Sequence, residues 1–334
     1  MASLLLAILY LMTFLLLTYV AVFLLSNRPR PPAPSEGKYK TNDGKGAVYT
    51  LPPHITCSTP SPASKTIDVT VVVPSYNETA RLGNMLEESV AYLETNHRGK
   101  YEIIIVDDGS TDGTGDFALE EASRLGLPPS VLKVVQLRKN RGKGGAVTYG
   151  VLHGSGKYIL FADADGATQF SDMRKLLAYL RSQPGPAVAV GSRAHMVNTD
   201  VLVQRSLLRN FMMYLFRALV YTVGIRGVKD TQCGFKMFSR EAAIKIFPHM
   251  HTERWIFDVE LLILAEAQGI LVEEVPVNWQ EVGGSKVDLA RDSIHMVKDL
   301  VVMRMAYALG IYKLDECGRK PQRLYSSEML DSNI

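Results

Sequence analysis

Two aspartates at the end of a short apolar run are the residues whose types and spacing most directly indicate chemistry. Asp163 and Asp165 follow the run 157–162 and precede Gly166. Side chains two residues apart point to the same side of a strand, so both carboxylates can converge on one divalent cation. Mg²⁺ and Mn²⁺ prefer oxygen ligands and often share their shell with substrate phosphates. The pattern predicts a metal site that binds a diphosphate, whereas a lone Asp-x-Asp is also typical of a solvated turn.

Polar side chains follow three earlier runs that are predicted to be strands. The run 67–73 leads into a loop with Glu78, and the run 101–106 ends in Asp107 and Asp108. The run 131–137 leads into a basic, glycine-rich stretch at 138–145, followed by a predicted helix. Glycines let backbone N–H groups approach an anion, and the helix start presents its positive end there. The stretch is therefore predicted to bind phosphate.

Strands and helices alternate from residue 67 to 193, which predicts βαβ units and an α/β fold. The central sheet should be Rossmann-like and mostly parallel, with helices on both faces. Ligands bind outside the carboxyl ends of the strands in such sheets. A later run at 272–279 contains Pro276 and is predicted to be an edge strand, because proline cannot donate a ladder hydrogen bond.

Composition narrows the class of protein. The chain has 334 residues and a net charge of +3, with no long run of like charge, so a nucleic-acid partner is not expected. Its 3 cysteines, Cys57, Cys233 and Cys317, are far apart, which fits a reducing compartment. These features do not indicate the oligomeric state.

The first 25 residues are predicted to form a retained transmembrane anchor. Residues 2–25 carry no charge and would span roughly 36 Å as a helix. A cleaved signal peptide would need a basic start and a shorter apolar core. Arg28 and Arg30 follow the run, so by the positive-inside bias the main body should face the cytosol. Residues 26–66 are rich in proline and are read as a linker or stalk without regular structure.

The later half contains two apolar helices that are predicted to lie near the membrane, at 207–225 and 294–312. The first helix carries Arg209 and Arg217, and with Arg205 just before it these fall on one face, either as solvated residues of a core helix or as groups facing phosphate at the membrane surface. The globular domain is predicted to span 67–317, and the tail 318–334 is predicted to be disordered.

Four motifs resemble the family-two glycosyltransferases, which have a GT-A fold. They are Val-Val-Val-Pro-Ser-Tyr-Asn-Glu at 71–78, Val-Asp-Asp-Gly-Ser-Thr-Asp-Gly-Thr at 106–114, Arg-Gly-Lys-Gly-Gly-Ala at 141–146 and Asp-Ala-Asp-Gly at 163–166. The anchor and the segments 230–236 and 255–261 are similar to one subgroup, which transfers glucose from UDP-glucose to dolichyl phosphate at the endoplasmic reticulum membrane. The resemblance covers about residues 67–290 and implies an inverting reaction.

The resemblance also implies site residues. Asp107 and Asp108 would hold the uracil and ribose, and Asp163 and Asp165 would hold Mg²⁺ or Mn²⁺. Ala167 stands where some relatives have a metal-binding glutamine, so water or another side chain must complete the shell. The residues expected to bind the UDP-sugar are Pro74, Tyr76, Glu78, Asp107, Asp108, Arg141, Lys143, Asp163, Ala164 and Asp165.

The acceptor phosphate is already anionic, so the transfer needs no strong base. It does need a cationic group that holds this phosphate beside the sugar. Arginine suits this role through its planar fork. Asp230, Asp258 and Glu260 are expected to orient arginines or sugar hydroxyls, and each basic candidate could instead be a surface ion pair. The residues expected to take part in the transfer are Asp165, Arg193, Arg205, Arg209, Asp230, Lys236 and Asp258. Mannosyl transfer from GDP-mannose and a binding module without turnover remain as alternatives.

Overall fold

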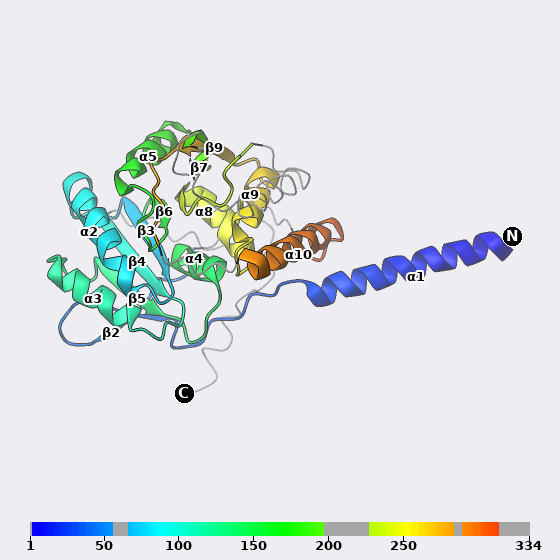
Figure 1. Cartoon of the computed structure of the whole chain (residues 1–334), viewed down its shortest axis with the longest axis horizontal. Coiled ribbons are helices and arrows are strands. Elements are labelled where there is room, and N and C mark those ends of the chain that lie inside the picture. Colours follow the sequence, from blue (N-terminus) through cyan, green and yellow to red (C-terminus); the bar gives the residue numbers. More distant parts are fainter. Residues whose placement is uncertain (1, 56–65, 197–226, 284–288, 314–334) are drawn as a thin grey trace.

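A computed structural model describes residues 2–55, 66–196, 227–283 and 289–313 of the chain. The described part consists of a domain built around one sheet and a long N-terminal helix, α1 (Ala2–Leu25), that projects from it (Figure 1). The predicted helix at 207–225, with Arg205 and Arg209, lies outside the described residues.

The sheet has nine strands among the described residues, in the order β2-β1-β5-β4-β3-β6-β8-β7-β9. Strands β3 to β7 and β9 run in one direction, whereas β8 is antiparallel to both of its neighbours. The predicted mostly parallel α/β sheet is thus confirmed. The strands are β1 (Lys38–Lys40), β2 (Val48–Thr50), β3 (Val69–Ser75), β4 (Tyr101–Asp107), β5 (Leu132–Gln136), β6 (Tyr158–Ala162), β7 (Ala187–Ser192), β8 (Phe235–Ser239) and β9 (Leu271–Pro276).

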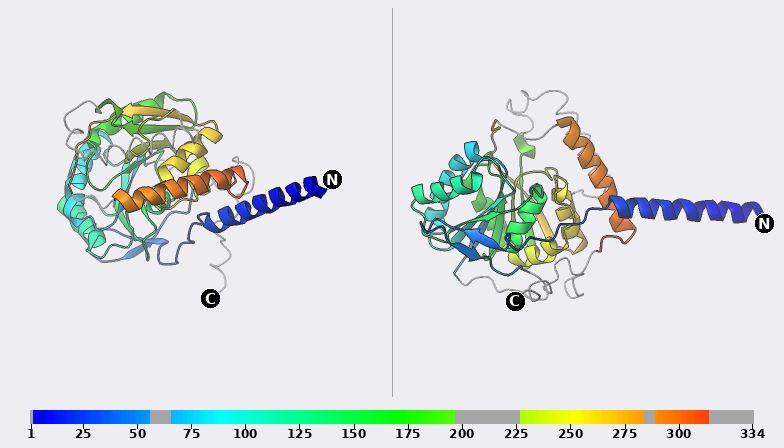
Figure 2. Two further views of the ribbon diagram at one scale, coloured as in Figure 1. Left: turned by 45° about the vertical axis from the view of Figure 1, so that its right-hand side comes forward. Right: turned by 90° about the horizontal axis from the view of Figure 1, so that it is seen from below.

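Helices cover both faces of the sheet, as predicted (Figures 1 and 2). One face packs against α2, α3 and α5, and the other against α4, α8, α9 and α10. The helices are α2 (Thr79–Asn96), α3 (Thr114–Arg124), α4 (Lys143–Leu152), α5 (Met173–Ser182), α8 (Arg240–Ile246), α9 (Phe257–Ala267) and α10 (Leu289–Ala308).

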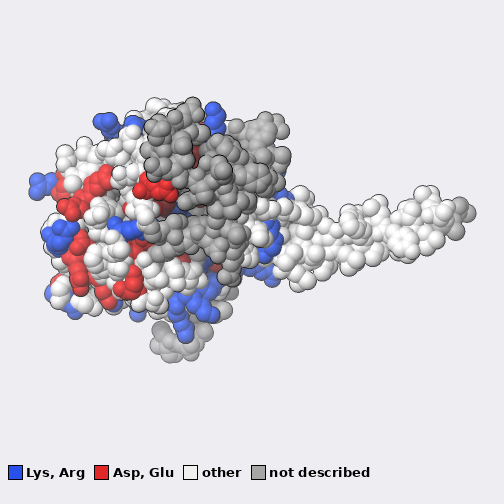
Figure 3. All heavy atoms as spheres, viewed as in Figure 1, with Lys and Arg blue, Asp and Glu red and all other residues white. Residues whose placement is uncertain are grey.

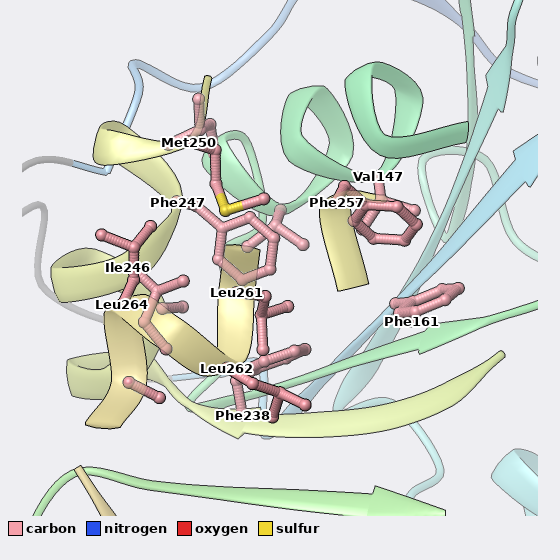
Figure 4. Packing of buried hydrophobic residues seen from close by; sticks show 14 of the residues in the cluster. Val147, Phe161, Phe238, Ile246, Phe247, Met250, Phe257, Leu261, Leu262 and Leu264 are labelled. Atoms are coloured by element: carbon pink, nitrogen blue, oxygen red, sulfur yellow. The ribbon is translucent and has the colours of Figure 1, made fainter. Parts of the chain in front are cut away.

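The alternation of side chains along the strands divides the core into two apolar clusters. On β3, Val71 and Val73 face the cluster under α2, whereas Val72 faces the cluster under α4. In the cluster under α4, the rings of Phe161 on β6 and Phe257 on α9 pack with centroids 5.8 Å apart (Figure 4). Burying an aromatic side chain of this size contributes about 1.5–3 kcal/mol. These clusters hold the strand ends, and with them the polar loops, in fixed positions.

Two parts of the fold differ from the sequence prediction. The stretch 26–66, read as a structureless linker, contributes β1 and β2, and Lys40 on β1 pairs with Val134 on β5. The stretch 230–236, read as a loop, runs into β8, so that Lys236 lies within a strand. β9 is the edge strand predicted from Pro276.

The N-terminal helix α1 is long and apolar enough to cross a membrane, and almost none of it is buried in the domain. Space-filling shows it without charged side chains, with basic side chains where it meets the domain (Figure 3). Helix α10 contacts α1 and lies beside its base (Figure 2). The hydroxyl of Tyr312, just after α10, donates to the carbonyl of Asn27 at 2.9 Å, which fixes the end of α1 to the domain.

Candidate active site

The polar residues predicted from the strand ends gather at one edge of the sheet. Strands β3, β4, β5, β6 and β7 all end there because they run in parallel. The antiparallel β8 instead begins there, with Phe235 opposite Ala162 at the end of β6. An antiparallel strand thus brings the residues that precede it, including Asp230 and Gly234, to the edge where its neighbours end. The sequence prediction missed this strand, and with it the position of Gly234, although it expected Asp230 to take part in the transfer.

Asp163 and Asp165 lie just beyond the end of β6. The backbone N–H of Asp163 donates to the carbonyl of Gly234 at 3.0 Å, and Asp165 Oδ1 accepts from the N–H of Ala167 at the same distance. Burial and the neighbouring Asp163 carboxylate raise the pKa of Asp165 above its usual value. A buried carboxylate that stands beside a second carboxylate is a group that a cation would stabilise.

Lys143, the first residue of α4, forms an ion pair with the Asp163 carboxylate. Its Nζ lies 2.7 Å from Oδ1 and 2.9 Å from Oδ2 of Asp163. Burial alone would lower the pKa of Lys143, but the carboxylates of Asp163 and Asp258 outweigh it and raise that pKa. The ammonium therefore stays charged beside the aspartate that the sequence assigns to a metal.

The two carboxylates fit a divalent cation that is shared with a diphosphate. Both offer oxygen, and a cationic group already stands against Asp163. Within the described ranges, no group of three or more His, Cys, Asp or Glu side chains could hold a metal ion. Substrate phosphates and water would have to supply the remaining ligands, which is typical of Mg²⁺. Gln169 does not complete the shell here, because its side-chain oxygen accepts from Asn278 Nδ2 at 3.0 Å.

Asp107 and Asp108 at the end of β4 are buried and hold backbone groups of neighbouring loops. Asp108 accepts from the N–H of Arg141 at 2.6 Å and from that of Gly142 at 2.8 Å. Asp107 accepts from the N–H of Ser110 at 2.9 Å. Burial raises the pKa of Asp108 to about 7, although both N–H donors oppose that shift. A direct contact of these carboxylates with uracil and ribose stays a prediction.

The stretch from β5 to the first residue of α4 is here called the basic loop (residues 138–143). Asp108 holds its backbone by hydrogen bonds. Gly142 has a φ of +91°, and a Cβ there would lie 2.6 Å from the carbonyl oxygen of Glu253. The N–H of Gly145 donates to that same carbonyl at 2.9 Å. These glycines therefore serve close packing against residues 253–257. The N–H groups of Gly142 and Gly145 are bonded within the protein, to Asp108 and to Glu253, and not free to meet a bound phosphate as predicted.

Glu78, after β3, connects to Asp165 through Arg81, a residue that the sequence prediction missed. Arg81 contacts both oxygens of Glu78, at 2.8 and 2.6 Å, and its Nη1 lies 3.9 Å from Asp165 Oδ2. The spacing of three residues on a helix was the available signal. Of the neighbouring candidates, Tyr76 is exposed and Pro74 is half-buried in β3.

Arg193, after β7, forms a two-point ion pair with Asp230. Its Nε lies 2.7 Å and its Nη2 2.8 Å from the two carboxylate oxygens. Burial would raise the pKa of Asp230, but the bonds from Arg193 outweigh it and lower that pKa. The guanidinium also lies over the ring of Trp279, 5.4 Å from the centroid, and within electrostatic range of Asp163. Arg193 is thus oriented at the same edge as the aspartates.

Lys236 and Asp258 are enclosed in the protein instead of facing the site. Lys236 has no exposed surface, and its Nζ donates to Asp258 and, at 2.7 Å, to the carbonyl of Cys233. This corrects the expectation that Lys236 holds the acceptor phosphate. Glu260 is likewise fully buried, where it accepts from Thr252 and His251. Both acids therefore organise the interior behind the site.

Gly234 and Ala164 pack closely around the two aspartates and leave little room for larger side chains. A Cβ on Gly234 would lie 1.8 Å from Asp163 Oδ2, so only glycine leaves that carboxylate in place. Ala164 is buried between the two aspartates. The sequence prediction included Ala164 but missed Gly234, because the contact joins β6 to a strand that it did not contain.

Comparison with protein families and curated proteins gives consistent matches. Residues 70–247 match the model of glycosyl transferase family 2. The chain is 49% identical over 318 residues to a dolichyl-phosphate beta-glucosyltransferase of Saccharomyces cerevisiae, covering 91% of this chain and 93% of the relative. It is 44% identical over 261 residues to the Homo sapiens protein of that name, covering 76% of this chain and 80% of the relative.

Solved structures share the fold at low sequence identity. Glucosyl-3-phosphoglycerate synthase from Mycobacterium tuberculosis in complex with UDP matches with a TM-score of 0.53 and 19% identity, covering 73% of this chain and 82% of that chain. Its complex with Mn²⁺, UDP and glucosyl-3-phosphoglycerate matches with a TM-score of 0.52 and 20% identity, covering 72% and 81%. At this identity the similarity demonstrates the fold and not the substrates.

Proposed function

The chain belongs to glycosyl transferase family 2 and, within it, to the dolichyl-phosphate β-glucosyltransferases, and we propose that it transfers glucose from UDP-glucose to dolichyl phosphate with inversion at the anomeric carbon. One observation carries the proposal. Asp163, Asp165 and Lys143 meet at the carboxyl edge of the sheet, with the Arg193–Asp230 pair at the same edge. The nearness of groups suited to a diphosphate and of a group suited to a phosphate acceptor supports the proposal.

The donor side of the site is built from the ends of β3 to β6. Asp163 and Asp165 would hold Mg²⁺ or Mn²⁺, which neutralises charge that develops on the departing UDP. Lys143 adds a second positive charge beside the diphosphate. Asp108 fixes the basic loop that Lys143 ends, so the cationic side chains are oriented before the donor binds. The use of Mn²⁺ with a UDP-sugar by a protein of the same fold supports a divalent cation.

The acceptor side centres on Arg193. In the reaction an oxygen of dolichyl phosphate attacks the anomeric carbon, the new C–O bond forms as the bond to UDP breaks, and both electrons of that bond leave with UDP. The attacking oxygen is already anionic, so the site needs to hold the phosphate rather than remove a proton. Asp230 orients the guanidinium through two hydrogen bonds, so its remaining N–H donors and positive charge can be directed at the acceptor phosphate.

The membrane places the acceptor within reach of this edge. We place α1 across the endoplasmic reticulum membrane, with the domain in the cytosol, because Arg28 and Arg30 follow its apolar stretch. Helix α10 lies beside the base of α1 and exposes Ile294 and Val301 on its surface. Apolar side chains at the foot of a membrane helix are suited to the lipid headgroup region, so α10 is proposed to rest on the bilayer.

The test is transfer of radiolabelled sugar into lipid that extracts into organic solvent. Full-length protein in detergent with dolichyl phosphate and Mn²⁺ or Mg²⁺ is supplied with UDP-glucose or GDP-mannose, with EDTA as the control. We expect lipid product from UDP-glucose, lost with EDTA, and inversion seen as a β-linked product by NMR. Lipid product from GDP-mannose alone would mean that the protein transfers mannose and not glucose. No lipid product from either donor would favour a binding module without turnover.

A further inference from the structure

The segment that joins α1 to the sheet, here called the strap (residues 27–55), is held to the domain at several points, where Glu36, Thr41, Leu51 and Ile55 are buried. Figure 1 shows it running from the end of α1 along the domain to β1 and β2. Glu36 on the strap has no exposed surface, although carboxylates are almost never fully buried unless they are paired. A carboxylate at this position therefore needs partners within the protein.

Four donors converge on the Glu36 carboxylate. Arg30 contributes Nη2 at 2.8 Å and Nη1 at 3.2 Å, and the N–H of Ala33 donates at 2.8 Å. The fourth donor is the backbone N–H of Arg138, at 2.8 Å, which belongs to the basic loop. Burial alone would raise the pKa of Glu36, but these donors outweigh it and lower that pKa. The carboxylate is therefore ionised and joins the strap to the loop.

Arg30 makes further contacts with the same loop. Its Nη2 donates to the carbonyl of Lys139 at 3.2 Å, and its own carbonyl accepts from the guanidinium of Arg141. Asp108 holds the N–H groups of Arg141 and Gly142 from the opposite side. The basic loop is thus clamped between a carboxylate of the sheet and a charged pair of the strap.

We propose that Glu36 and Arg30 are positioning residues for donor binding, which hold the basic loop in the geometry that receives the diphosphate of the sugar nucleotide. This inference rests on the proposed function, because it takes the basic loop and Lys143 as part of the donor site. It means that the segment after the membrane anchor is a working part of the active site and not a passive spacer. The donor site would then be complete only in a chain that carries this segment.

The chemistry of the pair explains why both charges are needed. A glutamine at position 36 has one acceptor oxygen instead of two, and its amide N–H groups would face N–H donors. A glutamine at position 30 loses the fork that contacts both oxygens, and leaves the Glu36 carboxylate with backbone donors alone. In either case the loop loses a charge-assisted contact, and the expected tenfold change in donor affinity corresponds to about 1.4 kcal/mol.

The experiment compares full-length E36Q and R30Q with wild type and with K38Q, in which the same strap loses an exposed charge on β1. Arg30 is partly exposed, so R30Q should fold even where E36Q does not, and melting temperatures verify this. KM for UDP-glucose, KM for dolichyl phosphate and kcat are measured separately, and UDP-glucose binding is measured by equilibrium dialysis with Mn²⁺ and no acceptor.

We expect the KM and Kd for UDP-glucose to rise about tenfold in R30Q and E36Q, with kcat and acceptor KM within about twofold of wild type and K38Q unchanged. Donor affinity within about twofold of wild type in R30Q would overturn the inference. A parallel fall in kcat and rise in both KM values would overturn it too, in favour of a structural role alone. If wild type itself does not bind UDP-glucose, the proposed function fails instead, and this inference with it.

Discussion

Replacing Gly234 by alanine tests whether the Asp163 carboxylate must stand where the structure places it. The added methyl carbon would lie 1.8 Å from Oδ2 and 2.2 Å from the carboxylate carbon of Asp163. A non-bonded carbon and oxygen need at least about 3.0 Å, so the carboxylate must move by about 1.2 Å. Gly234 does not have the left-handed φ that would strain an alanine, so the backbone is expected to keep its fold.

A displacement of about 1 Å in a reacting constellation can reduce the rate about 100-fold, or about 2.7 kcal/mol of barrier. We therefore expect G234A to transfer glucose about 100-fold more slowly, and to need more Mn²⁺ for half-maximal rate. The assay is the initial rate of radiolabelled lipid formation across a Mn²⁺ titration, with melting temperature as the check on folding. The matched control is G185A, whose new Cβ would meet open space and should leave the rate unchanged.

A G234A protein that retains at least about one third of the wild-type rate, with the same Mn²⁺ dependence, would refute this reasoning. It would mean that the carboxylate moves without consequence, and therefore that Asp163 does not set the geometry of the reaction. A loss of folding in G234A would be separated from this result by its melting temperature.

Three further predictions concern single residues of the site. D165N should reduce transfer by at least about 100-fold at saturating Mg²⁺ with an unchanged melting temperature, because a neutral amide cannot replace a carboxylate metal ligand; substantial residual activity would remove Asp165 from the metal site. R193A should raise the apparent KM for dolichyl phosphate more than that for UDP-glucose, and equal effects on both would remove Arg193 from the acceptor site. UDP-glucose binding without acceptor should weaken as the pH falls through about 7, the pKa of Asp108, because protonation removes one acceptor from the N–H groups of Arg141 and Gly142; D108N should bind weakly with no such pH dependence, and a flat wild-type profile would contradict the assignment.

The sequence was sufficient to predict the parts of the site that depend on local patterns. Asp107, Asp108, Asp163 and Asp165 directly follow β-branched or aromatic runs, and the carboxyl ends of parallel strands meet at one edge. Their convergence therefore follows from the period of the strands and the alternation with helices. The predicted edge strand at Pro276 follows from the missing N–H in the same way.

The parts that were missed depend on partners far along the chain. Lys236 can be buried in β8 because Asp258, on α9, neutralises it, and no local pattern signals that pair. The strap was read as a linker because proline and glycine rarely form elements, yet Glu36 docks it onto the loop at Arg138, about a hundred residues later. Gly234 matters only because β8 runs antiparallel beside β6 and brings it against Asp163.

The central claim is that the aspartates after β6 bind the cation that carries the sugar nucleotide. Its most direct test is a crystal structure of the full chain with Mn²⁺ and UDP-glucose, in which the anomalous signal of manganese locates the ion. We predict one manganese peak bridging the Asp163 and Asp165 carboxylates and the diphosphate, with Lys143 moved from Asp163 toward a phosphate. A manganese peak elsewhere, or UDP-glucose bound away from this edge of the sheet, would contradict the account.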